Sequence, residues 1–488
     1  MSKIEKIWSK NQNSLAGVDA KHLQLWKVDI PINDDKLNNA DIDVEKELEG
    51  VEMFPADLIS THSNGQFPVS SMKNVHINII VQAPVTRFSQ EVRAQDAVNW
   101  HDIESIYNWI KTLKRSNEIS SPKAYFIFIH GRDGTMETLF KGSEGMNGIC
   151  QRFEKRRATD RNNHHIPILV NGPGAGKSRF LQELPTLLNS QARQYTNDDA
   201  LLNSIENRMF TINVTFGNGT FASEEDVHIG QTSVALRIIY QHFIAGGSIN
   251  YDQFLREYDK TSQIPISDAL DIVLRDVNTN KDDDTKINFI VVGIDEINHL
   301  HNLYNKELDP RQNPVRLIVH AVGRLNCSGG DIFYVPILAG TIQGPLEEMF
   351  RESTYLYLRL PLRLLRDEEV WNISKNIANS NNLAEYINRS TFRRCISDLG
   401  GQVRALELFY SILSSQAMQK TNYVDYVYIM LQVKNLLLHR YPFETYANII
   451  TPAIAHAILN IPVKEYDKAD NNGQLNYIYL SSQGMLNL

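Results

Sequence analysis

From residue 166 onward, short apolar runs alternate with longer segments whose apolar residues recur at helical spacing. The apolar runs predict five strands, at Ile166–Val170, Phe210–Phe216, Asn288–Ile294, Ile332–Ala339 and Tyr355–Leu360. Runs this continuous are typical of strands that are buried on both faces, as in a parallel sheet covered by helices. The pattern therefore predicts an α/β fold of three layers, with a parallel sheet in the middle.

The N-terminal part of the chain has a different pattern. His22–Ile30 and Val75–Val81 alternate apolar and polar residues at the strand period. This predicts a small α+β unit, of ubiquitin-like type, over residues 1–84. Since two strands rarely form a stable unit, we expect a segment before Trp26, or a partner, to complete it.

The remaining segments are expected to be helical. Gln95–Leu113 has helical spacing, and so have Leu364–Ala378 and Leu406–Ala417 near the C-terminus, with a short hairpin near Tyr477–Leu480. The sequence thus predicts four parts: the small unit at 1–84, a linker or helical connector at 85–164, the α/β core at 165–360 and a mostly α-helical lid domain at 361–488.

Charge and composition restrict the classes of partner. The chain has 488 residues, 49 of them basic and 57 acidic, for a net charge of −8. A net negative charge gives no overall attraction to nucleic acid or anionic lipid, so strong nucleic-acid binding is not indicated. The basic run Lys155–Arg161 is interpreted as a solvated linker, with phosphate contact or nuclear import as the alternatives.

Neither a membrane span nor a disulfide framework is predicted. The sequence contains no run of about 18 apolar residues, and its first residues lack the apolar core of a secretory signal. The three cysteines, Cys150, Cys327 and Cys395, are far apart and have no metal-binding spacing. We interpret them as thiols in a reducing compartment.

The strongest chemical motif directly follows the first predicted core strand. Asn171–Ser178, with the sequence NGPGAGKS, fits the phosphate-binding loop G-x-x-x-x-G-K-[ST], with Asn171 in place of the first glycine. Asn is the non-glycine residue that best tolerates left-handed backbone, so we expect that conformation there. A helix predicted at Arg179–Leu188 would point its positive N-terminal end at the same anion.

The residue types of this loop fit ATP with Mg²⁺. Glycines let backbone N–H groups approach phosphate oxygens. Lys177 would contact the β- and γ-phosphates, and the Ser178 hydroxyl would be a ligand of Mg²⁺. The residues predicted to bind the nucleotide are Asn171, Gly172, Pro173, Gly174, Ala175, Gly176, Lys177, Ser178 and Arg179.

A second motif ends the predicted strand Asn288–Ile294. Asp295 and Glu296 follow it directly. An aspartate in this position orients Mg²⁺, and a neighbouring glutamate can polarise the attacking water. The pair predicts a P-loop protein that hydrolyses ATP, with Asp295 as a metal ligand and Glu296 as a catalytic residue.

Three further polar residues are candidates for the same site. In this division of P-loop proteins the strand before Thr341 lies between the two motif strands, so Thr341 would meet the γ-phosphate; the alternative is a strand-end threonine that caps the next segment. Arg404 is expected in the first turn of a helix after Asp398–Gln402, where it would contact phosphate or be a surface arginine. Arg351 is a candidate for reaching the ATP site of a neighbouring subunit in a homo-oligomer.

Two groups of segments resemble one protein family. LQLWKVDIPINDDKL, FPADLIS and VHINIIVQAP resemble the ubiquitin-like N-terminal domain of Crinkler effectors. NGPGAGKSR, NVTFGNGT, IVVGIDEI, VPILAGTI and DLGGQVRALE are similar to the P-loop ATPase of the Crinkler and retrotransposon-hot-spot group. Only a short segment precedes LQLW, so we expect an N-terminal domain shortened at its start.

The resemblance implies a secreted effector with a Mg²⁺-dependent, ATP-hydrolysing P-loop domain, which acts in a host cell, or its nucleus, on an unidentified target. Because no signal segment is visible, a cytoplasmic protein is the alternative. A second class of function is an intracellular signalling or scaffold protein that oligomerises with ATP and turns it over slowly. A third, an ATP-regulated DNA-associated protein, is disfavoured by the net charge.

Overall fold

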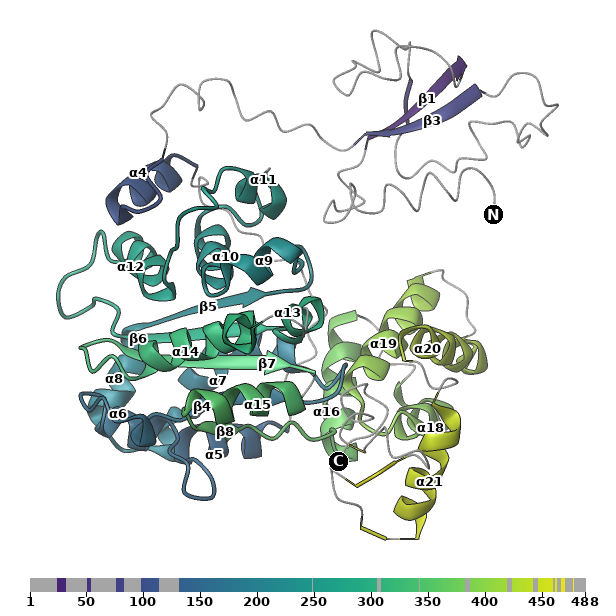
Figure 1. Cartoon of the computed structure of the whole chain (residues 1–488). Coiled ribbons are helices and arrows are strands. Elements are labelled where there is room, and N and C mark those ends of the chain that lie inside the picture. The colour runs from purple at the N-terminus through teal and green to yellow at the C-terminus, as the bar shows by residue number, and fades with distance from the viewer. Residues whose placement is uncertain are drawn as a thin grey trace. The chain divides into compact units, whose positions relative to one another are not determined.

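The computed structural model places the chain in two compact units, and Figure 1 shows their elements. The first comprises Met1–Val98 and Gly246–Arg256, and the second comprises Asn99–Ala245 and Glu257–Leu488. The structure describes residues 24–31, 51–53, 76–82, 98–113, 131–247, 249–304, 309–341, 343–381, 387–418, 424–441, 446–459, 461–462, 467–469 and 477.

The first unit contains a three-stranded antiparallel sheet. Its strands are β1 (Gln24–Pro31), β2 (Val51–Met53) and β3 (His76–Gln82), in the order β2-β1-β3. Trp26 lies opposite Glu52 on one side and Ile80 on the other. Both predicted strands are confirmed, and the third comes from residues that follow Trp26. The segment expected before Trp26 lies outside the described residues. The unit also contains α11 (Tyr251–Arg256).

The second unit is built around a five-stranded parallel sheet, which confirms the predicted α/β class. The sheet order is β5-β6-β7-β4-β8. β7 therefore lies between the strands that carry the two motifs, as predicted. Every residue of β4, β6 and β7 is buried, as a sheet covered on both faces requires. The strands are β4 (Ile166–Val170), β5 (Met209–Thr215), β6 (Phe289–Asp295), β7 (Phe333–Gly340) and β8 (Tyr357–Arg359).

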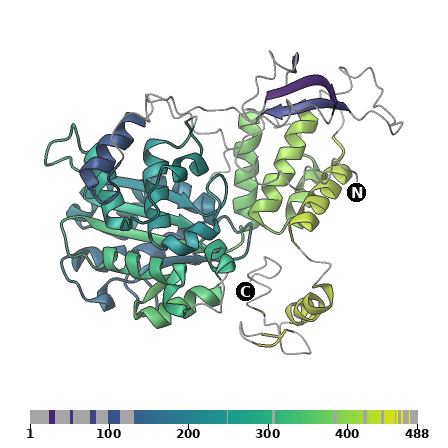
Figure 2. The same cartoon turned by 45° about the horizontal axis from the view of Figure 1, so that its top comes forward.

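Helices cover both faces of this sheet (Figure 2). One layer consists of α5 (Asp133–Lys141), α6 (Ile149–Glu154), α7 (Lys177–Tyr195) and α8 (Asp199–Asn207). The other consists of α9 (Glu224–Ile229), α10 (Thr232–Phe243), α12 (Ile266–Val277), α13 (Asn298–Leu303), α14 (Pro314–Asn326) and α15 (Gln343–Ser353), with α4 (Ile103–Leu113) packed on α10 and α12. Short 3₁₀ turns occur at η4 (Arg161–Asn163) and η5 (Pro310–Gln312).

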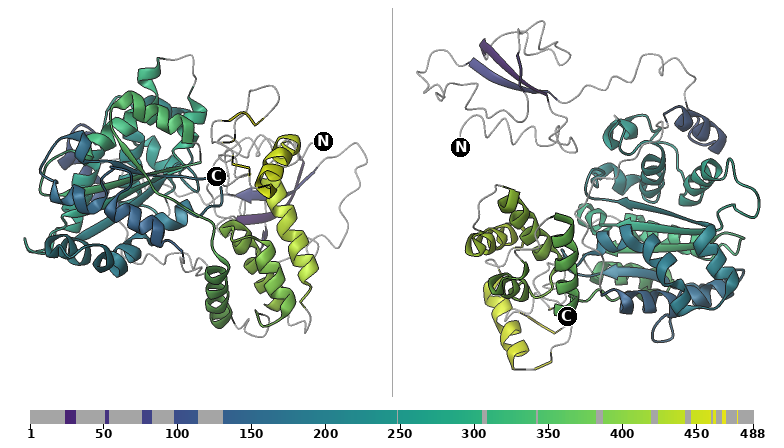
Figure 3. Two further views of the ribbon diagram at one scale, coloured as in Figure 1. Left: turned by 90° about the horizontal axis from the view of Figure 1, so that it is seen from below. Right: turned by 180° about the vertical axis from the view of Figure 1, so that it is seen from behind.

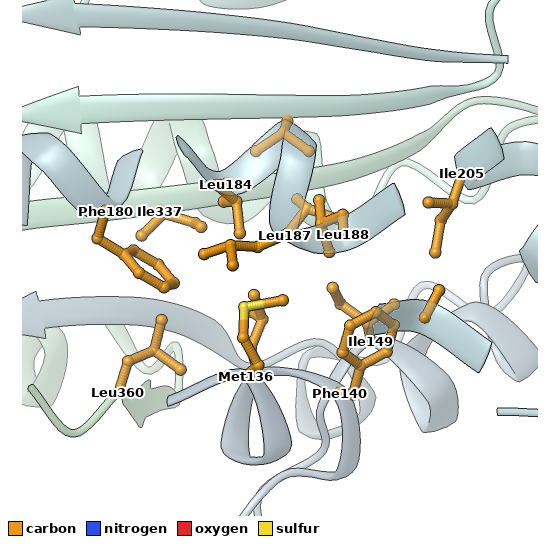
Figure 4. Close-up of a cluster of buried hydrophobic side chains, with 14 of the residues drawn as sticks. Met136, Phe140, Ile149, Phe180, Leu184, Leu187, Leu188, Ile205, Ile337 and Leu360 are labelled. Atoms are coloured by element: carbon orange, nitrogen blue, oxygen red, sulfur yellow. The ribbon is translucent and has the colours of Figure 1, made fainter. Parts of the chain in front are cut away.

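The core between the sheet and the first helical layer changes one predicted boundary. Figure 4 shows Phe180 and Leu184 of α7 in the same cluster as Met136 and Phe140 of α5. Alternate residues of β7, including Ile337, complete the cluster, because successive strand side chains point to opposite faces. Residues 131–164 therefore pack as part of the α/β core, and the predicted connector at 85–164 is too long.

The C-terminal segment is mostly helical, as predicted (Figure 3). Its helices have their own core, which includes Phe392, Leu406 and Phe409. Of the hairpin expected near Tyr477–Leu480, only Tyr477 is described, and its backbone is helical. No described helix is long and apolar enough to cross a membrane. The helices are α16 (Asp367–Asn381), α18 (Ser390–Asp398), α19 (Val403–Met418), α20 (Tyr426–Arg440) and α21 (Ala447–Ile458).

Candidate functional site

The phosphate loop joins the end of β4 to the start of α7. Gly174 and Gly176 have φ angles of 78° and 93°, in the left-handed region that favours glycine. Gly176 is also the N-cap of α7, so the loop turns directly into the helix. The backbone thus has the local geometry that brings consecutive N–H groups and a helix N-terminus to one anion.

Lys177 is the buried cation of this loop. Its side chain is 7% exposed, and Nζ donates hydrogen bonds to the carbonyls of Asn171 at 2.7 Å and Gly172 at 3.0 Å. Burial lowers the pKa of Lys177 to about 8, while the negative charges of Asp295 and Glu296 oppose the shift. Because β4 and β6 are parallel members of one sheet, the lysine and both acidic residues lie at the same edge of the sheet.

Asn171 does not have the backbone conformation that the sequence suggests. The non-glycine residues with positive φ among those described are Glu144, Glu296 and Thr354. The Asn171 side chain instead donates from Nδ2 to the carbonyl of Leu362 at 3.2 Å. The expected left-handed turn is wrong, and the amide ties the phosphate loop to the segment that follows β8.

Asp295 and Glu296 lie where β6 ends. Asp295 is buried, and its Oδ1 accepts a hydrogen bond from the Glu296 backbone at 2.9 Å. Glu296 has a φ of 57°, a strained conformation for a residue with a side chain. Its carboxylate lies directly against Gly217, two residues after the end of β5. Strain of this kind is common at functional sites and requires support from the surrounding structure.

Thr341 follows the last residue of β7, one strand away from Asp295. Its backbone N–H donates to Oδ1 of Asn298 at 3.2 Å, and Asn298 is buried at the start of α13. Ile297 N–H donates to the Ala339 carbonyl at 3.2 Å, so the ends of β6 and β7 are joined. The contact with γ-phosphate stays a prediction.

Arg404 lies against the phosphate loop from the helical domain. It is the second residue of α19, as predicted, and a β-carbon built on Gly174 would lie 2.9 Å from Arg404 Cβ. Its guanidinium pairs with Glu407 at 3.1 Å. The structure therefore brings the stem of Arg404 to the loop, and its role toward phosphate stays a prediction.

The other predicted site residues have different surroundings. Ser178 is exposed at the start of α7, and Arg179 forms an ion pair with Glu183 one turn along the same helix. Arg351 is exposed on the last turn of α15, which leads to the start of β8. The parallel strand order places that end of β8 at the edge opposite the phosphate loop. The structure does not bring Arg351 to the site within this chain, and its role toward a neighbour stays a prediction.

Two residues at the loop are missed by the motif analysis. Arg132 is 4% exposed and donates to the carbonyls of Ala175 at 3.1 Å and Arg363 at 3.2 Å. Burial, with the charge of Arg363 as a second cause, lowers its pKa to about 10. Tyr441, also buried, donates from its hydroxyl to the Pro173 carbonyl at 3.1 Å. Both come from segments distant in sequence from the loop, so no local spacing marks them.

The oxygen donors near the loop fit Mg²⁺. Asp295 offers a buried carboxylate and Ser178 an exposed hydroxyl, both hard oxygen ligands. Mg²⁺ at nucleotide sites takes only one or two ligands from the protein and the remainder from phosphate and water. Among the described residues no group of three or more His, Cys, Asp or Glu side chains is arranged to hold a metal ion. Asp295 and Ser178 are therefore the residues that would hold Mg²⁺ together with a nucleotide.

The solved structures that the chain resembles include proteins of Aeropyrum pernix and Pyrobaculum aerophilum. The chain resembles the ORC1 protein of Aeropyrum pernix in complex with DNA, with 10% identity, a TM-score of 0.33, and coverage of 59% of this chain and 62% of that one. The ORC2 protein of the same organism, in ADPNP and ADP complexes, is 12% identical with a TM-score of 0.35. The match covers 71% of this chain and 89% of that one. Cdc6p from Pyrobaculum aerophilum is 13% identical with a TM-score of 0.25, and the match covers 58% of this chain and 66% of that one. TM-scores below 0.5 do not establish a shared fold, and the P-loop fold follows from the strand order and the loop geometry.

Sequence comparison is more informative about the family. Residues 4–82 match the Crinkler effector protein N-terminal domain. Crinkler effector protein 108 of Phytophthora sojae is 26% identical over 287 residues, which are 58% of this chain and 32% of that protein. The aligned region is thus about a third of the length of this relative. These matches confirm the resemblance predicted from the sequence: residues 4–82 resemble the Crinkler N-terminal domain, and a P-loop α/β domain follows them in the chain.

Proposed function

We propose that the second unit is a Mg²⁺-dependent ATPase. The observation that carries the proposal is the placement of Lys177, Asp295 and Glu296 at the C-terminal edge of the parallel sheet, where β4 and β6 end on either side of β7. A buried cation on a phosphate loop, beside two carboxylates from the next motif strand, is the arrangement expected for holding and cleaving a nucleoside triphosphate. ATP is accordingly the proposed ligand.

Each residue has a separate part in the proposed reaction. Lys177 leaves the carbonyls of Asn171 and Gly172 and pairs with phosphate oxygens, since an ammonium bonds an anion more strongly than a neutral carbonyl. Asp295 and Ser178 hold Mg²⁺, which neutralises phosphate charge when it is bound. Glu296 accepts the proton of the attacking water.

The remaining candidates would contact the γ-phosphate from two sides. Thr341 lies between the motif strands, at the end of β7, and Arg404 approaches from the helical domain. For this contact Arg404 must exchange its ion pair with Glu407 for a phosphate oxygen. An exposed pair of this kind contributes about 0.2–1 kcal/mol, so the exchange costs little.

Phosphate release tests the proposal directly. The intact chain should release phosphate from Mg-ATP, and Lys177→Ala should lose most ATP binding because the loop then lacks its cation. Turnover in Lys177→Ala equal to that of the unchanged chain would contradict the assignment. Light scattering with and without ATP tests the accompanying proposal of a homo-oligomer, and separates an ATPase from a scaffold that oligomerises with slow turnover.

We further propose that the chain is a secreted effector whose ATPase acts in a host cell. The Crinkler N-terminal match at residues 4–82 supports this, with that domain serving delivery and the later domains acting. A tagged chain expressed by its own organism should be found inside host cells during colonisation. Retention of the tagged chain in the producing cells would contradict the proposal and leave the ATPase assignment intact.

A further inference from the structure

We propose that Arg237 is a positioning residue for Glu296, and that it acts through the loop that joins β5 to α9. This loop, residues 216–223, is called the β5–α9 loop below. The inference rests on the proposed ATPase function and adds residues that no phosphate-loop or Asp-Glu motif contains. It assigns to the loop the task of holding the Glu296 carboxylate where it can act on water.

The contact between the loop and Glu296 leaves no room for a side chain. A β-carbon built on Gly217 would lie 1.4 Å from Oε2 of Glu296 and 2.6 Å from its Cδ. Gly217 does not have the positive φ that would itself require glycine. The need for glycine at this buried position therefore comes from the Glu296 carboxylate, which lies on the Gly217 backbone.

The β5–α9 loop is joined to β6 and closed on itself. Phe216 N–H donates to the Asp295 carbonyl at 3.0 Å, and so extends the pairing of β5 with β6. Thr220 donates from its hydroxyl to the Thr215 carbonyl at 2.6 Å and from its N–H to the Gly217 carbonyl at 3.0 Å. Gly217 is thereby held in place from both sides.

Arg237 ties this loop together from inside α10. Its guanidinium is 1% exposed and donates to the carbonyls of Thr215 at 3.1 Å, Thr220 at 3.0 Å and Phe221 at 3.1 Å. Its Cζ also lies 4.2 Å from the centre of the Phe216 ring. One side chain thus fixes the last residue of β5, before Gly217, and the loop residues after it.

Asp226 balances the buried charge and anchors the far end of the loop. It is fully buried and accepts from Arg237 Nη1 at 2.7 Å and Nη2 at 2.9 Å. The same carboxylate accepts from the Ser223 backbone at 2.8 Å, at the start of α9. This two-pronged pair suits a guanidinium and not an ammonium, because lysine cannot bond both oxygens and three carbonyls in fixed directions.

The network should affect turnover and not nucleotide affinity. The phosphate loop is held by other residues, namely Arg132, Asn171 and Tyr441. The β5–α9 loop instead contacts Glu296, whose proposed role is exercised only when water attacks. Displacement of a general base lowers kcat and leaves ground-state binding in place.

The first test is Gly217→Ala in the full chain. The added methyl group must displace the Glu296 carboxylate, so we expect kcat for Mg-ATP to fall by about 10- to 100-fold, with the ATP dissociation constant changed by less than about threefold. Gly134→Ala is the matched control, because a β-carbon there meets no atom within 4 Å. Unchanged kcat in Gly217→Ala, or a loss of ATP binding from a folded protein, would overturn the inference.

The second test is Arg237→Lys, which keeps the buried positive charge beside Asp226 but removes the guanidinium that bonds both Asp226 oxygens. We expect the same selective fall in kcat, whereas Arg193→Lys, at an exposed ion pair with Glu206, should have no effect. Each variant is then combined with Glu296→Gln. If the network acts through Glu296, the double variants should turn over ATP as slowly as Glu296→Gln alone, within about twofold.

The outcomes separate this inference from the proposed function. If the second substitution lowers kcat of Glu296→Gln by the same factor as it lowers kcat of the unchanged chain, the network acts elsewhere and the inference is overturned. If Gly217→Ala does not fold, the Arg237→Lys comparison decides alone, and normal turnover there overturns the inference. An unchanged chain without ATP turnover overturns the proposed function and the inference together. If the unchanged chain turns over ATP and both Gly217→Ala and Arg237→Lys do so at the same rate, only the inference is overturned.

Discussion

The hydroxyl of Tyr441 donates a hydrogen bond to the carbonyl of Pro173 at 3.1 Å, and this bond joins the helical domain to the phosphate loop. The same oxygen lies 2.5 Å from the position of a β-carbon built on Gly174. The loop therefore needs glycine at 174 both for its φ of 78° and for the approach of Tyr441.

Tyr441→Phe should weaken this connection without changing the shape of the side chain. A partly buried hydrogen bond of this kind contributes about 0.5–1.5 kcal/mol, and the free energy of unfolding should fall by that amount in urea denaturation. Tyr428→Phe, on the exposed side of α20, is the matched control. An equal loss in both variants would show that the bond to Pro173 contributes nothing specific.

Asn171→Gly restores the usual first glycine of the loop. Because the Asn171 amide bonds the Leu362 carbonyl, we expect the free energy of unfolding to fall by about 1–2 kcal/mol, from the lost bond and the added freedom of glycine. ATP affinity, measured by calorimetry, should remain. A gain in stability would instead show that the bond to Leu362 does not stabilise the folded chain.

The affinity for ATP should depend on pH through Lys177. Burial lowers its pKa to about 8, so the free protein loses this proton as pH rises through 8, whereas bound phosphate favours the charged form. Binding then takes up a proton, and affinity should fall by about tenfold per pH unit above 8. Calorimetry in buffers of different ionisation enthalpy measures the uptake. Lys177→Met should remove this pH dependence, and its persistence there would assign the proton to another group.

Glu296→Gln and Asp295→Asn should fail in different ways. Glu296→Gln keeps the size of the side chain but cannot accept a proton, so Mg-ATP should bind while kcat falls by about 100-fold or more. Asp295→Asn should raise the Mg²⁺ concentration required for half-maximal turnover by about tenfold or more, because a charged ligand is lost. Identical effects in the two variants would contradict the separate roles.

Deletion of residues 1–84 should leave ATP binding intact. The residues of the phosphate loop all belong to the second compact unit, and so do Arg132 and Tyr441, which contact the loop. Calorimetry on the shortened chain should give the ATP affinity of the full chain. Lost binding in a shortened chain that remains folded would make the N-terminal domain part of the active site.

Local patterns in the sequence predict most of the α/β domain. The strand at Ile166–Val170 has the predicted bounds, and the other four core strands agree within a few residues. Buried parallel strands are marked by continuous apolar runs, and the phosphate loop by glycines and Lys177 within eight residues. Both signals are local, so one sequence is sufficient to find them. The connector boundary is less well predicted, because whether α5 and α6 join the core depends on contacts with α7.

The sequence by itself determined the fold class, the order of the motifs and the chemical types of the site residues, because each of these depends on neighbouring residues along the chain. Only the tertiary structure decided what surrounds them. It brings Arg132 and Tyr441 to the phosphate loop and assigns the Asn171 amide to Leu362. It also places the Glu296 carboxylate against Gly217, next to residues that Arg237 holds by hydrogen bonds to their carbonyls. These contacts join segments far apart in the chain. The periodicity and spacing of residues do not indicate which buried polar groups will form hydrogen bonds with one another.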